Sequence, residues 1–300
     1  MDKRPCQTKG TQNKNKIKSL TSPGACVLVE QLESPTLGYI SQIKGGITKQ
    51  RYCSATIFVD HTSRLRYVHL QKSLTSAENV ESKKAFEDYT GKDVNVVRHY
   101  HAENDRFVNN TLLKAVAGAG QTISYCSFNA HFQNGVAEKR ISNLQDQACK
   151  QLLNVKALWP PSSELNIWPY ALIKSNQLKN ILTDKEYGSS PLKRFSRMNV
   201  SPKLKDNNVF GCLVYALTNR LQAHGCQPKW LPRARLGINL GPSPRHSGYI
   251  TLVSSLMTGL VSPKFHVRCD NLFENMRPYA GNGPTSYQWK VISGLKSRAI

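Results

Sequence analysis

Hydrophobic and polar positions along this chain repeat with two periods, one typical of strands and one typical of helices. Short apolar or β-branched runs predict strands at 26–29, 55–60, 65–70, 94–101 and 122–126. Apolar positions that recur every three or four residues predict helices at 76–89, 110–117, 134–155 and 168–181. One strand, a hairpin and then alternating helices and strands predict an α/β fold, a mixed sheet with flanking helices.

The last third of the chain has a different pattern, in which Gly and Pro separate short apolar runs. These runs predict strands at 210–215, 234–241, 249–253 and 265–267, a spacing that suits a small β-barrel of about 60 residues. The whole pattern predicts five parts: a basic flexible arm at 1–24, an α/β core at 25–158, a helical and basic linker at 159–208, a β domain at 209–274 and a disordered tail at 275–300.

The charge of the chain narrows the class of partner. There are 41 Lys and Arg residues against 19 Asp and Glu residues, a formal net charge of +22. A field of this size attracts polyanions and releases their counterions on binding, so DNA is the expected partner. Two alternatives would explain the charge without a DNA partner. One is a basic surface that is merely solvated, and the other is a decaying gene whose amino-acid composition has drifted.

Targeting and cysteine patterns set further limits. No apolar run reaches the roughly 18 residues of a membrane span, and the N-terminus has no apolar secretory core. We therefore expect an intracellular protein without a membrane partner. The eight cysteines are scattered and form no CxxC pair, which indicates reduced thiols rather than a disulfide framework.

Three carboxylates stand at the boundaries of the predicted elements. Glu30 follows the first strand, Glu103 follows the strand at 94–101, and Glu138 lies in the first turns of the long helix. In a sheet of this order the first and fourth strands can be neighbours, and a following helix can bring a third acid beside them. Such oxygen-rich sites suit Mg²⁺ or Mn²⁺, and two ions can assist phosphodiester displacement. The alternative is simpler, because the helix macrodipole favours Glu in any first turn.

The segment HFQNGVAEKRI, at 131–141, closely resembles the motif around the last acid in integrases of copia-type long-terminal-repeat retrotransposons. Other segments resemble the same family in the expected order: CVLVEQLESPTLG, VDHTSRLRYVHL, RHYHAENDRF, FGCLVYAL, PRARLGINLGPSPRH and TGLVSPKFHVRCDNLFE. The resemblance covers about residues 20 to 275.

The resemblance implies a ribonuclease H-like core followed by an SH3-like β-barrel. It also implies a reaction in which Mg²⁺ or Mn²⁺ activates water or a 3′-hydroxyl to attack a DNA phosphodiester. The catalytic and metal-binding acids carried over by position are Glu30, Glu103 and Glu138. Glu30 and Glu103 stand where the family has Asp, and Asp105 stands where it has Gly. Each Glu is one methylene longer, in a kind of site that tolerates only about 0.5 Å, so we expect low or no activity.

Three further expectations come from the resemblance. Cys6 matches the last cysteine of a zinc module whose other ligands are absent, so we expect no zinc. Asn134, Lys139 and Arg140 are expected to contact DNA phosphates, although the two basic residues could be merely solvated. A functional protein of this kind would be nuclear and could form a homo-oligomer.

Three hypotheses about function stay open. The chain is an integrase-like enzyme with impaired DNA integration, a non-enzymatic basic DNA-binding protein that keeps the fold, or the product of a decaying element that barely folds.

Overall fold

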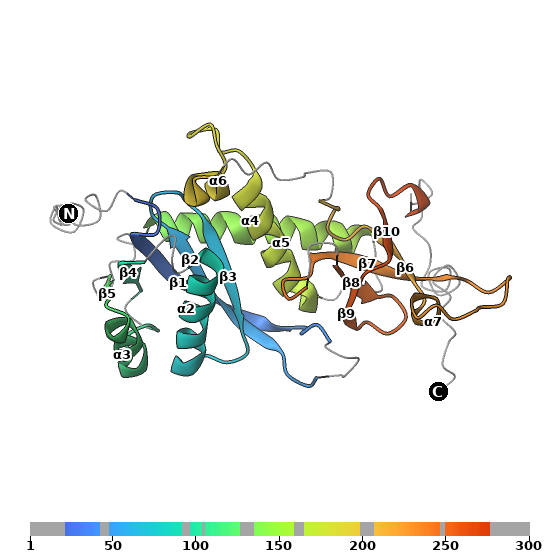
Figure 1. Ribbon diagram of the computed structural model, residues 1–300, viewed down its shortest axis with the longest axis horizontal. Helices are drawn as coiled ribbons and strands as arrows, with labels where there is room; N and C mark the ends of the chain where they lie inside the picture. The colour runs from blue at the N-terminus through green and yellow to red at the C-terminus, as the bar shows by residue number, and fades with distance from the viewer. Residues whose placement is uncertain are drawn as a thin grey trace, which may run out of the picture.

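The computed structural model describes residues 22–42, 48–91, 97–103, 106–126, 135–158, 165–198, 207–246 and 250–276. Two five-stranded sheets make up the described part of the chain (Figure 1). The strands of the first are β1 (Cys26–Gly38), β2 (Tyr52–Asp60), β3 (Arg66–Gln71), β4 (His99–Ala102) and β5 (Thr122–Tyr125). The strands of the second are β6 (Leu213–Leu217), β7 (Ala234–Pro242), β8 (Thr251–Ser255), β9 (Val261–Lys264) and β10 (Val267–Asp270). The helices are α2 (Ser76–Thr90), α3 (Asn110–Gly118), α4 (Gly135–Leu158), η2 (Leu165–Ile167), α5 (Trp168–Ile181), α6 (Pro191–Ser196), α7 (Asn219–Gln222) and η4 (Glu274–Met276).

The first sheet is mixed, with the order β3-β2-β1-β4-β5. β1 and β3 both pair with β2 in antiparallel fashion, whereas β1, β4 and β5 run parallel to one another. The first and fourth strands are therefore neighbours, as the sequence analysis expected. This mixed sheet with flanking helices is the α/β architecture that the sequence pattern predicted.

The first strand is longer than its apolar run predicted. It continues to Gly38 instead of ending at residue 29, because the backbone goes on pairing with β2 at Leu32↔Ala55 and Glu33↔Ser54. Glu30 is therefore a mid-strand residue and not one that follows a strand. Because side chains alternate along a strand, Glu30 lies on the same face of the sheet as Leu28 and Leu32.

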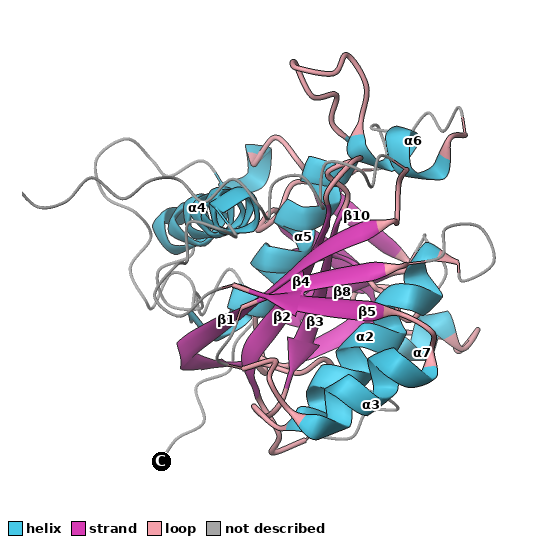
Figure 2. Cartoon of the chain, turned by 90° about the vertical axis from the view of Figure 1, so that its left-hand side faces the viewer, coloured by secondary structure: helices cyan, strands magenta, loops and turns pink. Residues whose placement is uncertain are grey.

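Helices cover both faces of the first sheet (Figure 2). On one side α2 and α3 enclose an aromatic core in which the rings of Phe58 and Phe86 stack with centroids 4.7 Å apart. On the other side α4 packs its buried stripe against β1 and β2 through Ala137, Ile141 and Leu144. Fully burying an aliphatic side chain contributes about 1.5–3 kcal/mol, so this stripe fixes the position of α4 firmly.

The second sheet is antiparallel and open, with the order β10-β6-β7-β8-β9. A small β-barrel was expected here, and the described residues do not confirm its closure. A barrel closes only when its two edge strands pair, whereas β9 pairs with β8 and β10 pairs with β6. The strand expected at 265–267 overlaps β10 only at Val267, because Phe265 and His266 form a bend between β9 and β10.

One hydrophobic core joins the two sheets. Its members include Val155 of α4, Leu172 of α5, Leu213 of β6 and Ile238 of β7. Gly211 lies at this junction with a positive φ of 81°, so close to Val155 that a Cβ atom would overlap the valine side chain. Only glycine satisfies both the backbone conformation and the close approach.

None of the helices in the described ranges combines the length and apolar character needed to cross a membrane.

Replacing Gly211 by Ala is expected to lower the free energy of unfolding by about 2–4 kcal/mol, through left-handed strain and overpacking against Val155. Urea denaturation measures the change. Gly118→Ala is the matched control, because Gly118 lies in α3 with open space around it. The control should be neutral or stabilising by up to about 1 kcal/mol. Equal effects of the two substitutions would contradict the close approach at Gly211.

Candidate active site

Glu30 and Glu103 are neighbours in the register of the first sheet. The parallel pairing of β1 with β4 ends at Val29↔Ala102. Glu30 is the next residue of β1, and Glu103 is the residue that follows β4. Glu30 faces α4, since Leu28 and Leu32 on either side of it belong to the core that α4 covers. The register therefore brings two of the three predicted acids to the same place.

Glu138 reaches the same region from the first turn of α4, beside the buried Ala137. Burial, followed by the negative charges of Glu103 and Glu138, raises the pKa of Glu30 from 4.5 to about 7. A neighbouring charge has such an effect only over a short range. The three predicted acids therefore share one electrostatic environment.

The carboxylate of Glu30 has an unsatisfied oxygen. Its Oε2 atom is buried and accepts no hydrogen bond from the residues that the structure describes. A buried acceptor without a partner is costly, and a proton or a cation would relieve that cost.

Carboxylate oxygens are the donors that Mg²⁺ and Mn²⁺ prefer. However, no three His, Cys, Asp or Glu side chains in the part of the chain that the structure describes lie close enough to hold a metal ion. The donors thus have the right chemistry for the ion, but their spacing in this structure does not fit it.

Cys126 is a fourth member of this region, which the sequence analysis treated as an ordinary buried thiol. It follows β5 as Glu103 follows β4, and its backbone N–H donates to the Ala102 carbonyl at 3.1 Å. Burial, followed by the charges of Glu103, Glu138 and Glu30, raises the pKa of its thiol to about 11. The thiol is therefore neutral and adds no charge to the acids. Only the parallel register of β5, which the sequence does not reveal, would have identified it.

A histidine lies next to this thiol on the same face. The Nε2 atom of His101 is 3.5 Å from Cys126 Sγ, and its Nδ1 atom is 2.8 Å from Ser124 Oγ. Burial, followed by the charges of His99 and His61, lowers the pKa of His101. His101 is therefore neutral at physiological pH and does not balance the charge of the acids.

The predicted DNA contacts have different placements. Lys139 is exposed on α4, whereas Arg140 is half-buried. The charge of Arg140 contributes to lowering the pKa of Arg66 and of Arg194, after burial in both cases, so Arg140 stands among other arginines. Asn134, Asp105 and Cys6 lie outside the described residues.

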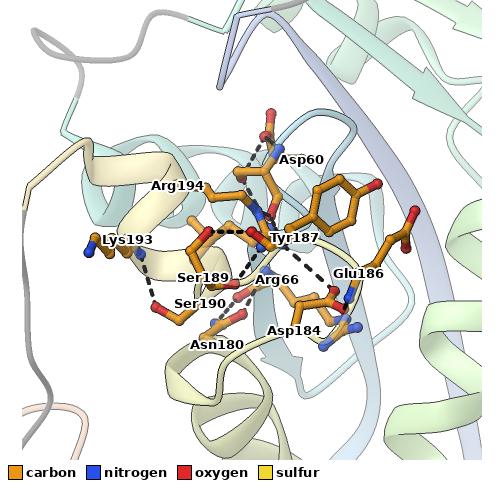
Figure 3. Close-up of polar contacts among 12 residues, drawn as sticks. Asp60, Arg66, Asn180, Asp184, Glu186, Tyr187, Ser189, Ser190, Lys193 and Arg194 are labelled. Carbon is orange, nitrogen blue, oxygen red and sulfur yellow. Dashed lines mark hydrogen bonds and ion pairs between the residues drawn. The ribbon is translucent and has the colours of Figure 1, made fainter.

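A polar cluster at the turn between β2 and β3 serves the fold. Buried Asp60 accepts hydrogen bonds from the Gly24 N–H at 2.8 Å and from the Ser63 N–H and Oγ at 2.6 Å each. Arg194 of α6 donates to the Ser63 carbonyl from Nε and Nη2, and its Nη2 lies 3.8 Å from Asp184 Oδ2 (Figure 3). These bonds close the turn and attach α6 to it, which commits the charges of Asp60 and Arg194 to internal contacts.

Comparison with known proteins gives matches only among solved structures. No protein-family model matches the sequence, and no curated protein does. The integrase catalytic core domain of HTLV-2 in complex with magnesium, in its trimeric form, is 16% identical with a TM-score of 0.41 and covers 58% of this chain and 97% of its own. The intasome of simian T-cell lymphotropic virus in complex with PP2A regulatory subunit B56 gamma is 12% identical with a TM-score of 0.44, covering 83% and 79%. The catalytic core domain of BIV integrase is 13% identical with a TM-score of 0.41, covering 58% and 95%.

These structural neighbours are retroviral integrases. Similarity at this level assigns this chain neither a family nor an activity.

The raised pKa of Glu30 predicts a pH-dependent stability. Because its pKa rises from 4.5 in the unfolded chain to about 7 in the folded one, the stability it contributes is fully present below pH 4.5 and is lost as the pH rises through 7. Glu30→Gln, which mimics the protonated acid, should remove this loss. Urea denaturation at pH 4.5 and pH 8 should therefore show a smaller drop for the variant than for the wild type.

The control for this test is Glu186→Gln, because Glu186 is an exposed carboxylate and its charge is not among those that raise the pKa of Glu30. Its pH dependence should equal that of the wild type. A Glu30→Gln variant that loses as much stability as the wild type between the two pH values would refute the shared environment of the acids.

Proposed function

We propose that this chain is an integrase-like, DNA-binding protein of copia type in which metal-dependent phosphodiester transesterification is impaired. The observation that carries the proposal is the parallel register of β1 with β4, which sets Glu30 beside Glu103. It is supported by the raised pKa of Glu30, to which burial contributes most and the charges of Glu103 and Glu138 contribute next. The motifs around these acids, in the family's order, support the same assignment.

DNA as the partner is supported by charge. The net charge of +22 favours a polyanion, and the exposed Lys139 on α4 is close in sequence to Glu138. We assign DNA-phosphate contact to Asn134, Lys139 and Arg140. We propose that the second sheet belongs to an SH3-like domain that binds DNA. We also propose that the protein is nuclear and that it associates with itself as a homo-oligomer. The division into five parts given by the sequence pattern stays part of this proposal.

Under this proposal Glu30, Glu103 and Glu138 are the residues that would hold Mg²⁺ or Mn²⁺, and they would have to come closer together than they lie in this structure. When bound, the ions would activate the attacking oxygen and stabilise the leaving oxygen of the phosphodiester. The residues of the chain oppose this in two ways. Glu30 and Glu103 are each longer than Asp by one carbon–carbon bond, about 1.5 Å, in a site whose tolerance is about 0.5 Å. Glu30 also has a pKa of about 7, so at neutral pH a proton competes with the cation for its oxygens.

The second candidate is a DNA-binding protein without catalysis. It is favoured by the spacing of the acids, since no three potential ligands among the described residues are close enough to bind one ion. The two candidate functions predict different results when Glu30 and Glu103 are shortened to Asp. Only the impaired enzyme would gain activity.

Reverting the two substitutions separates these candidates. The double variant Glu30→Asp/Glu103→Asp is expected to bind Mn²⁺ in calorimetric titration and to join an oligonucleotide 3′ end to target DNA at least tenfold faster than the wild type. The reason is that Asp sets the carboxylate oxygens at the distance from the backbone for which the family's metal site is built. Adding Glu138→Gln to the double variant should abolish the gain.

Two results would count against the proposal. Wild-type strand transfer as fast as that of the double variant would show that the glutamates do not impair catalysis. A double variant that folds and binds DNA but gains neither Mn²⁺ binding nor strand transfer would favour the non-enzymatic candidate.

A further inference from the structure

The connection between β6 and β7 presents a tryptophan to solvent. Trp230 is 90% exposed, and the adjacent Leu231 is 52% exposed. The connection projects away from the second sheet (Figure 1). A large aromatic side chain held in water at the tip of a projection gives up the free energy of burial and contributes nothing to the core.

The turn that carries Trp230 is held by hydrogen bonds on both sides. The Leu231 N–H donates to the Pro228 carbonyl at 3.1 Å, which closes a tight turn around Trp230. At its base, Gln227 Nε2 donates to the Pro232 carbonyl at 2.7 Å, and Gln227 Oε1 accepts from Thr218 Oγ1 at 3.1 Å. The two prolines also restrict the backbone on either side. An aromatic side chain on such a pre-organised turn loses little conformational entropy when a ligand binds.

The stretch of chain that carries Trp230 contains basic residues and no acidic ones. No Asp or Glu occurs between Asn207 and Cys269. The ammonium of Lys229 lies 5.8 Å from the centre of the Trp230 ring. The exposed basic residues on the same connection and on the strand that follows it are Arg220, Lys229, Arg233 and Arg235. A basic surface around one exposed indole matches a partner that carries negative charge and flat aromatic faces.

We propose that the turn at 228–231 in the β6–β7 connection, called the tip below, binds single-stranded nucleic acid. An unpaired base would stack on Trp230, and Lys229 and the neighbouring arginines would contact phosphates. Single-strand binding proteins combine the same two elements, a basic track and aromatic platforms. Bases within a duplex already stack on one another, so the indole would select unpaired or frayed nucleotides. The proposal rests on the proposed function in one respect, that DNA is the partner of this chain, and it adds which form of DNA the second sheet recognises.

Binding of three probes by the full chain tests this: a single-stranded oligothymidylate, an abasic oligonucleotide of the same length, and a duplex. Trp230→Ala is expected to weaken binding of oligothymidylate by about 5- to 150-fold, the loss associated with one stacked base. Binding of the abasic strand should not change, because its phosphates are the same and it has no base to stack. Trp230→Phe should retain most of the affinity, and the wild type should show a quenching of tryptophan fluorescence by oligothymidylate that Trp230→Phe lacks.

A matched control separates stacking from charge. Lys229→Ala should weaken binding of the single-stranded and abasic probes equally and reduce the salt dependence of binding by about one ionic contact. Because Trp230 is exposed, its variants should unfold at the same denaturant concentration as the wild type, which urea titration checks.

Three outcomes would overturn the proposal. If the wild type binds DNA and Trp230→Ala and Trp230→Phe bind oligothymidylate equally well and as tightly as the wild type, stacking is refuted while the proposed function stands. If the wild type binds none of the probes, the proposed DNA-binding function fails with it. If Trp230→Ala changes only the sedimentation of the protein and not its DNA affinity, the tip is a contact between copies of this chain.

Discussion

The packing of α4 is the interaction on which both the core and the candidate active site depend. Its buried stripe, from Ala137 to Ala148, covers the first sheet, and Val155 near its end fits against Gly211 at the start of the second. Glu138 in its first turn adds the third carboxylate to the two that β1 and β4 supply. A shift of this one helix would therefore disturb the hydrophobic core, the junction of the two sheets and the cluster of acids together.

The chemistry of the site follows from the face on which Glu30 lies. Leu28 and Leu32 flank Glu30 on the face that α4 covers, so its carboxylate faces an apolar layer as well as two other acids. Both influences favour the protonated acid, and neutral Cys126 and His101 nearby do not oppose them. A site of this kind needs a cation to be stable when ionised.

Much of this arrangement could be predicted from local pattern, and the remainder depended on distant partners. The helices at 110–117 and 168–181 matched α3 and α5 closely, because their apolar positions and flanking residues are local signals. The length of β1 depends on its pairing with β2, and the residues of β1 alone do not indicate that pairing. Closure of the predicted barrel is not confirmed, and local pattern could not decide it, since only the placement of β9 and β10 determines whether their edges meet. The position of Cys126 beside the acids depends on the pairing of β5 with β4, and the 90% exposure of Trp230 depends on how the β6–β7 connection folds. Neither can be predicted from the local sequence pattern.

The central claim is that Glu30, Glu103 and Glu138 share one electrostatic environment. The most direct measurement is the pKa of the Glu30 carboxyl, followed by carbon NMR of glutamate-labelled protein and assigned by its loss in Glu30→Gln. If the three acids share this environment, the pKa of Glu30 is near 7 in the wild type and lower in each of the variants Glu103→Gln and Glu138→Gln. A Glu30 pKa near 4.5 that neither substitution changes would contradict it.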